Sequence, residues 1–162
     1  MEAEYEVGTN VVYPAHGVAE ICAIETKLIG GTKLRFYHLH VLGSGLKIIV
    51  PLIKAEENGM RPIADEAAIS ELYSLLQDHE VPHDRQTWNR RYRGFMEKIR
   101  TGSLFDVGEV YRDLSLLKNT KTLSHGERQM LQTARSLVVR ELSTARSAPE
   151  AQIADELDSM FK

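Results

Sequence analysis

The chain has 162 residues, of which 43% are hydrophobic and 27% charged, a mixture typical of a folded globular protein rather than a disordered one. No apolar run approaches the roughly 18 residues that a membrane-spanning helix needs, and the acidic N-terminus is unlike a secretory signal peptide. The single cysteine, Cys22, excludes an internal disulfide and a thiolate metal cluster, so we expect a cytoplasmic protein.

The net charge of −3 is unevenly distributed along the sequence. Residues 63–84 contain six acidic side chains and no Lys or Arg, whereas residues 85–100 contain six Lys or Arg and one Glu. A compact positive segment in an acidic protein can contact a few phosphates while the rest of the protein repels bulk DNA. The distribution therefore favours a protein that a partner delivers to DNA.

The first 50 residues have the alternation and the turn signals of short β-strands. Strands are predicted over residues 9–13, 18–28, 34–41 and 46–50. Glycine-containing turns predict hairpins at 29–32 and 43–45, and Pro51 ends the last strand. Four or five short strands with tight turns predict a small, strongly bent sheet or partial barrel, with an edge open to a partner.

From about residue 65 the apolar period changes to that of helices. Helices are predicted from Asp65 or Ser70 to before Pro82, from Asp84 to about Arg100, from Ser103 to Lys118, from Ser124 through Leu142, and from Glu150 through Phe161. Ser124 and Glu127 form a capping box at the start of the fourth helix. The predicted fold is therefore α+β, with a β domain over residues 1–62 and an all-α domain over residues 66–162.

Signatures of an enzyme are missing from the sequence, which has no Gly-rich phosphate loop, no nucleophile elbow and no zinc-protease motif. His38 and His40 share a strand face and could begin a metal site, but partly exposed sheet histidines are the commoner outcome. Cys22 lies in a predicted strand and is more consistent with a small core residue than with a nucleophile. We therefore expect no enzyme, no bound metal and no cofactor.

A basic aromatic segment, residues 84–93, contains the only tryptophan of the chain. On a helix, Trp88, Arg91 and Tyr92 fall on one face, and Arg90 and Arg93 flank it. Arginine binds phosphates bidentately, and a planar ring can stack on a base or wedge beside it. The alternative is that Trp88 anchors the helical core and the arginines form a solvated face. Residue chemistry alone leaves both interpretations open.

Several motifs follow one another with a characteristic spacing over nearly the whole chain. They are Val7-Gly8 with Val11-Val12-Tyr13-Pro14, His16-Gly17-Val18, Thr87 to Arg93 followed by Met96-Glu97-Lys98, Val110 to Leu114, Leu123-Ser124 with Gly126-Glu127-Arg128, and Ala134 to Leu137. In these motifs the chain resembles the CarD/CdnL family of bacterial transcription regulators. It is most similar to the stand-alone CdnL type, since no basic tail follows the helical domain.

The resemblance implies a Tudor-like N-terminal domain that binds the RNA polymerase β subunit, in a holoenzyme with the primary sigma factor, and a helical domain at promoter DNA. It implies that Trp88 wedges into the minor groove at the upstream edge of the melted bubble and stabilises the open complex. The neighbouring residues expected at the DNA are Arg90, Arg91, Tyr92 and Arg93. We expect the protein to act as a monomer.

For the polymerase surface we expect Lys27 and the fourth predicted strand, with Lys47, Ile49 and Pro51. Some relatives carry a basic residue at the position of Ile49, whereas this chain has Lys47 two residues earlier. Because residues two apart share a strand face, the positive charge is displaced along one face rather than lost.

The residues also leave other functions open. Small β barrels and basic helices serve RNA- or ribosome-associated modules as well. A helix-turn-helix repressor would place a turn at Gly102-Ser103, although the acidic flanks and the lone aromatic suit shape readout better. A small enzyme would have to use His38, His40 or Cys22.

Overall fold

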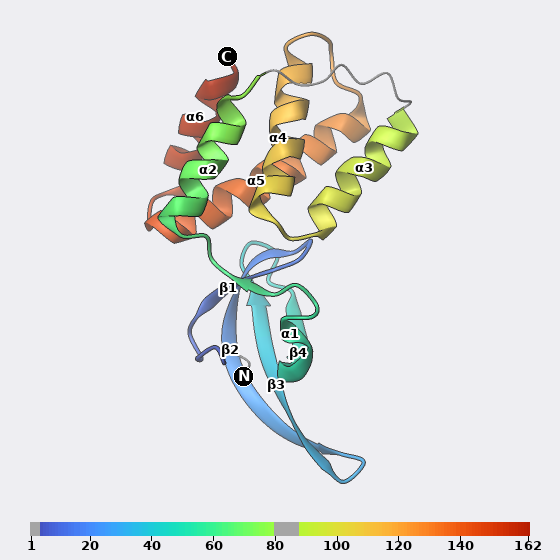
Figure 1. The fold of residues 1–162 in the computed structure, drawn as a ribbon, viewed down its shortest axis with the longest axis vertical. Helices are drawn as coiled ribbons and strands as arrows, with labels where there is room; N and C mark the ends of the chain where they lie inside the picture. The colour runs from blue at the N-terminus through green and yellow to red at the C-terminus, as the bar shows by residue number, and fades with distance from the viewer. Residues whose placement is uncertain (1–3, 80–87) are drawn as a thin grey trace. The chain divides into compact units, whose positions relative to one another are not determined.

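The computed structural model describes residues 4–79 and 88–162, without the side chains of Trp88 and Asn89 (Figure 1). The chain forms two compact units, Met1–Ile63 and Ala64–Lys162. The first contains an antiparallel sheet of five strands, and the described residues of the second form helices. The predicted α+β class, with the sheet preceding the helices, is confirmed.

The strands of the sheet are arranged in the order β4-β3-β2-β1-β5. Their bounds are β1 Asn10–Tyr13, β2 Gly17–Ile29, β3 Thr32–Val41, β4 Lys47–Pro51 and β5 Arg61–Pro62, with helix α1 at Leu52–Ala55. The predicted hairpin between β2 and β3 is confirmed, and Gly30 and Gly31 both have positive φ, as a type I′ hairpin turn requires. Helix α1 and strand β5 are too short to produce a periodic signal, and the prediction missed both.

One face of this sheet is buried and the other is open. The buried face includes Val11, Ala19, Ile21, Tyr37, Leu39, Val41 and Val50. Because side chains alternate along a strand, Leu34, Phe36, His38 and His40 of β3 lie on the opposite, open face. Residues paired directly across the ladder share a face, so the register of β2 and β4 against β3 fixes which of their side chains are open.

A β-bulge interrupts the pairing of β2 with β3. The register shifts between Ile21 and Ala23, which leaves Cys22 as the additional residue. Cys22 is exposed, so the prediction that it is a core residue is wrong. The prediction considered only the strand and the small size of the residue, whereas Cys22 follows buried Ile21 and alternation along the strand turns its side chain to the open face.

The helices of the second unit begin and end close to the predicted positions. They are α2 Glu66–Gln77, α3 Trp88–Arg100, α4 Leu104–Lys118, α5 His125–Arg146, α6 Glu150–Asp158 and the 3₁₀ turn η1 Ser159–Phe161. The N-caps predicted at Asp65 and Ser103 are confirmed, as is the capping box of Ser124 with Glu127. The cap predicted at Asp84 lies outside the described residues.

Helix α4 lies at the centre of the helical core and packs against α2, α3 and α5. Gly108 allows the close approach of α2, because a Cβ at this position would lie 2.5 Å from Cδ1 of Leu72. A polar cluster joins α4 and α5 to the end of α6: the Tyr111 hydroxyl donates to Asp158 over 2.7 Å, and Arg135 donates to the same carboxylate over 2.8 Å. None of the helices in the described part of the chain combines the length and apolarity of a membrane span.

Candidate functional site

Helix α3 has one face in the core and one face open. Phe95 and Ile99, one turn apart, are buried in the helical core, and Met96 packs against it. Arg90 and Arg93 are exposed, Arg91 is half-buried and the side chain of Tyr92 is 41% exposed. The helix is therefore held to the bundle by its second half, while its first half presents guanidinium groups to solvent.

The charges on α3 divide in the same way. In the second half, the Lys98 ammonium donates to Glu109 over 2.6 Å, and Arg100 pairs with Glu97 at 3.2 Å. In the first half, Arg90, Arg91 and Arg93 form no ion pair within the described part of the chain. Three cations on less than one and a half turns of helix can bind successive phosphates.

Trp88 is the first described residue of α3. Its side chain lies outside the described part of the structure, so its predicted role as a wedge stays a prediction. The position of Trp88 next to the unpaired arginines follows from the sequence and from the start of the helix.

The four residues predicted to contact polymerase share the open face of the sheet. Lys27 is paired with Leu34, and β4 lies against β3 with Pro51 opposite Phe36, Ile49 opposite His38 and Lys47 opposite His40. Lys27 and Lys47 are exposed, Ile49 is 54% exposed and Pro51 is half-buried. The hairpin therefore brings Lys27 of β2 onto the same surface as three residues of β4, about twenty positions later in the chain.

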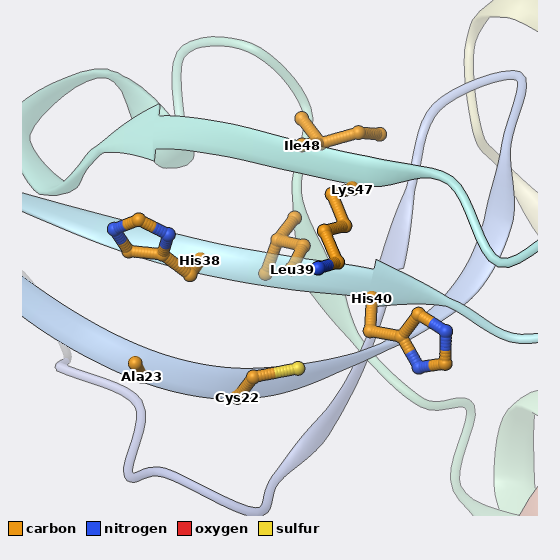
Figure 2. A pocket seen from close by; sticks show the side chains of 7 residues that line it. All are labelled: Cys22, Ala23, His38, Leu39, His40, Lys47 and Ile48. Atoms are coloured by element: carbon orange, nitrogen blue, oxygen red, sulfur yellow. The ribbon is translucent and has the colours of Figure 1, made fainter.

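An open hollow of about 390 Å³ lies on the sheet beside Lys47 (Figure 2). It is lined by Cys22, Ala23, His38, Leu39, His40, Lys47 and Ile48. Figure 2 shows these side chains on three neighbouring strands, with the small Cys22 and Ala23 of the bulge on one side and Lys47 on another. The bulge thus contributes two small side chains where a regular strand would present one residue to this face.

The histidines of this face are part of a surface network. His38 Nε2 lies 2.7 Å from a carboxylate oxygen of Glu25, so one ring nitrogen already has a partner. Within residues 4–79 and 88–162, no group of three His, Cys, Asp or Glu side chains could hold a metal ion. Sequence reasoning missed Glu25, although counting back from the Gly30-Gly31 turn pairs it with Phe36, next to His38 on the same face.

Comparison with known proteins identifies the family. Residues 5–64 match the family model described as "CarD-like/TRCF RID domain", and residues 71–158 match "CarD, C-terminal domain". The chain is also 33% identical over 150 residues to "Putative transcription factor YdeB" of Bacillus subtilis (strain 168), covering 92% of this chain and 97% of that protein. The chain belongs to the CarD/CdnL family.

A solved structure is also similar to this CarD/CdnL family member. The chain described as "CdnLNt from Myxoccoccus xanthus" is 35% identical, with coverage of 41% of this chain and 93% of that one and a TM-score of 0.34. The CarD/CdnL family is of a transcription-factor type and is not an enzyme family. The two family models and the Bacillus subtilis relative confirm the predicted family, and the chain is a transcription regulator.

Proposed function

We propose that the chain binds the β subunit of RNA polymerase through the open face of its sheet and stabilises the promoter open complex through α3. The observation that carries the proposal is the match of both units, in order, to the two CarD family models. The RID model matched by the N-terminal unit suggests an interaction with RNA polymerase. In this proposal the protein acts as a monomer in the cytoplasm, on holoenzyme with the primary sigma factor.

The DNA contact consists of aromatic rings and several cations. Trp88 wedges at the upstream edge of the bubble, where stacking is already broken, so that much of the cost of unstacking an intact duplex is avoided. Arg90, Arg91 and Arg93 bind the adjacent phosphates, and Tyr92 adds a second ring. The exposure of Arg90 and Arg93, and the absence of described acidic partners for them, support this assignment.

The free energy needed to shift polymerase toward the open complex is small compared with the free energy of DNA melting. Opening a duplex costs about 1.4 kcal/mol per base-pair step, and stacking of a base on an aromatic ring contributes about 1–3 kcal/mol. A polymerase that nearly balances its closed and open states is shifted by a contribution of this size. Because the protein binds the open state better than the closed one, it changes their populations without any chemical step.

Because the N-terminal unit binds polymerase, a weak contact of α3 with DNA is sufficient. Once the sheet is bound to polymerase, the contact of α3 with DNA becomes intramolecular and its effective concentration rises. The six acidic residues of segment 63–84 disfavour binding to DNA away from polymerase. The charge distribution of the sequence is therefore consistent with recruitment through a protein partner.

The proposal is tested by the lifetime of open complexes formed by purified holoenzyme and challenged with a competitor. With saturating protein, we expect the lifetime to increase several-fold. An unchanged lifetime, together with a preference of the free protein for single-stranded RNA over a forked promoter duplex, would instead support an RNA-associated module.

A further inference from the structure

The open face of the sheet carries a continuous apolar stripe, which we define as Ile29, Leu34, Phe36, Pro51 and Ile49. Leu34 and Phe36 are neighbours on one face of β3, and Phe36 is paired with Pro51 of β4. Ile29 lies diagonally beside Leu34 at the tip of the hairpin, and Ile49 follows Pro51 on the same face of β4. Phe36 is at the centre of this stripe.

The stripe is not part of the hydrophobic core. None of its five residues belongs to the buried cluster of the N-terminal unit or to the side chains packed against that cluster. Ile29 and Ile49 are 51% and 54% exposed, and Leu34, Phe36 and Pro51 are half-buried. A contiguous exposed apolar surface with a polar rim is typical of an interaction site.

The hairpin that carries half of the stripe extends beyond the sheet (Figure 1). Strand β1 pairs with β2 only as far as Glu20, and β4 pairs with β3 only from Phe36 to His40. From Thr26 to Arg35 the ribbon therefore has two strands, an arrangement that is only marginally stable in water without further packing. A partner that covers the stripe would supply this packing.

The charges around the stripe indicate the chemistry of that partner. Lys27 and Lys47 flank it on the same face, both are exposed, and neither has an ion pair within the described residues. Two acids share this face: Glu25 is already bound to His38, and Glu20 lies opposite His40, on the other side of β3 from Lys47. The surface that fits this face is therefore apolar at its centre and acidic at its rim.

We propose that Phe36, with Leu34 beside it, is the anchor of the polymerase contact, and that Lys27 and Lys47 act from the rim. The inference rests on the proposed function and names the side chains that carry most of its affinity. Buried aromatic anchors at the centre of an interface mainly slow dissociation, whereas rim charges mainly accelerate association and make it salt-dependent. The two kinds of side chain should therefore differ in kinetics.

The test measures association and dissociation rates of the full chain on immobilised RNA polymerase at two salt concentrations. Phe36→Thr, which keeps a residue suited to a strand, should weaken binding at least about tenfold through faster dissociation, with unchanged salt dependence. Lys47→Gln should slow association and reduce its salt dependence. Leu34→Thr provides a second anchor variant should Phe36→Thr fail to fold, as judged by circular dichroism.

A matched control lies on the same ribbon. Leu28 is 69% exposed and paired with Lys33, on the face opposite the stripe, so Leu28→Thr should bind within about twofold of the wild type. If folded Phe36→Thr and Leu34→Thr bind within twofold while Lys47→Gln loses affinity, the anchor proposal is wrong and the proposed function survives. If the wild-type protein itself does not bind polymerase, both are wrong.

Discussion

The helical unit and the open face of the sheet differ in how their Lys and Arg side chains are paired. In the helical unit, Asp158 binds Tyr111 and Arg135, and Lys98 binds Glu109. Buried Glu127 accepts a hydrogen bond from the backbone N–H of Ser124 and pairs with Lys121 at 3.1 Å. On the open sheet face, by contrast, Lys27 and Lys47 have no ion pair within the residues that the structure describes.

Helix α3 contains both patterns: the cations of its second half are paired, and those of its first half have no ion pair with any residue that the structure describes. A charge paired at a half-buried position contributes to folding, whereas exposed ion pairs and exposed cations without a partner contribute little to it. The two groups of residues should therefore be separable by experiment. Substitutions in the first group should lower stability, and substitutions in the second should lower binding at constant stability.

The largest effect on stability is expected for Asp158→Ala. The Tyr111 hydroxyl is buried and would lose its acceptor, and Arg135 would lose the three hydrogen bonds that its Nε and Nη2 donate to the carboxylate. Because an unsatisfied buried donor costs about 1–3 kcal/mol, we expect the free energy of unfolding to fall by about 2 kcal/mol. Chemical denaturation measures this loss, and Asp155→Ala, an exposed acid one turn away, should cost under about 0.5 kcal/mol.

The same carboxylate predicts a dependence of stability on pH. Burial raises the pKa of Asp158, but the hydrogen bonds from Arg135 and Tyr111 outweigh it and hold this pKa below 3.8. A lowered folded-state pKa contributes stability above the unfolded value, and this contribution is lost as the pH falls through the folded-state pKa. The difference in unfolding free energy between wild type and Asp158→Ala should therefore shrink below pH 3.8. A difference that stays constant down to acid unfolding would contradict this account.

The next effect concerns binding through the sheet. Lys47→Glu reverses an exposed charge that has no ion pair among the described residues, and we expect affinity for the polymerase β subunit to fall about tenfold. The free energy of unfolding should change by less than about 0.5 kcal/mol. Lys54→Glu, on α1 and paired with Glu57, is the matched control and should leave binding unchanged. If both variants lose the same affinity for polymerase, binding depends only on the overall charge of the protein.

A smaller effect is expected at the DNA. Arg90→Gln and Arg93→Gln should each weaken binding to a forked promoter duplex a few-fold, and each should reduce the salt dependence by about one counterion. Fluorescence anisotropy at several salt concentrations measures both quantities. Arg100→Gln removes a cation that is paired with Glu97 and should have less effect. If Arg100→Gln loses as much affinity for the forked duplex as Arg90→Gln, the division of α3 into two halves has no functional meaning.

Local signals made much of the fold predictable from the sequence. The Gly30-Gly31 turn and the Ser124 capping box are defined by neighbouring residues, and the structure has both. The bulge at Cys22 could not be predicted, because it exists only in relation to the partner strand. The pairing of Glu25 with His38 depends on the same register.

The candidate site was predictable only in part. Residue type and the family motif single out Trp88 and its arginines, because they lie close together in sequence. Lys27 and Lys47 share a face because β2, β3 and β4 pair in one register. No local sequence pattern specifies this pairing. The division of α3 into paired and unpaired halves also needs structure, since Glu109 lies on the next helix.

The most direct test of the account is the open-complex lifetime with Trp88→Ala at saturating concentration, compared with wild type and Trp88→Phe. We expect Trp88→Ala to bind polymerase normally but to shorten the lifetime several-fold, nearly to that of polymerase alone, with Trp88→Phe in between. A Trp88→Ala protein that binds polymerase and prolongs the lifetime as well as wild type would contradict the account.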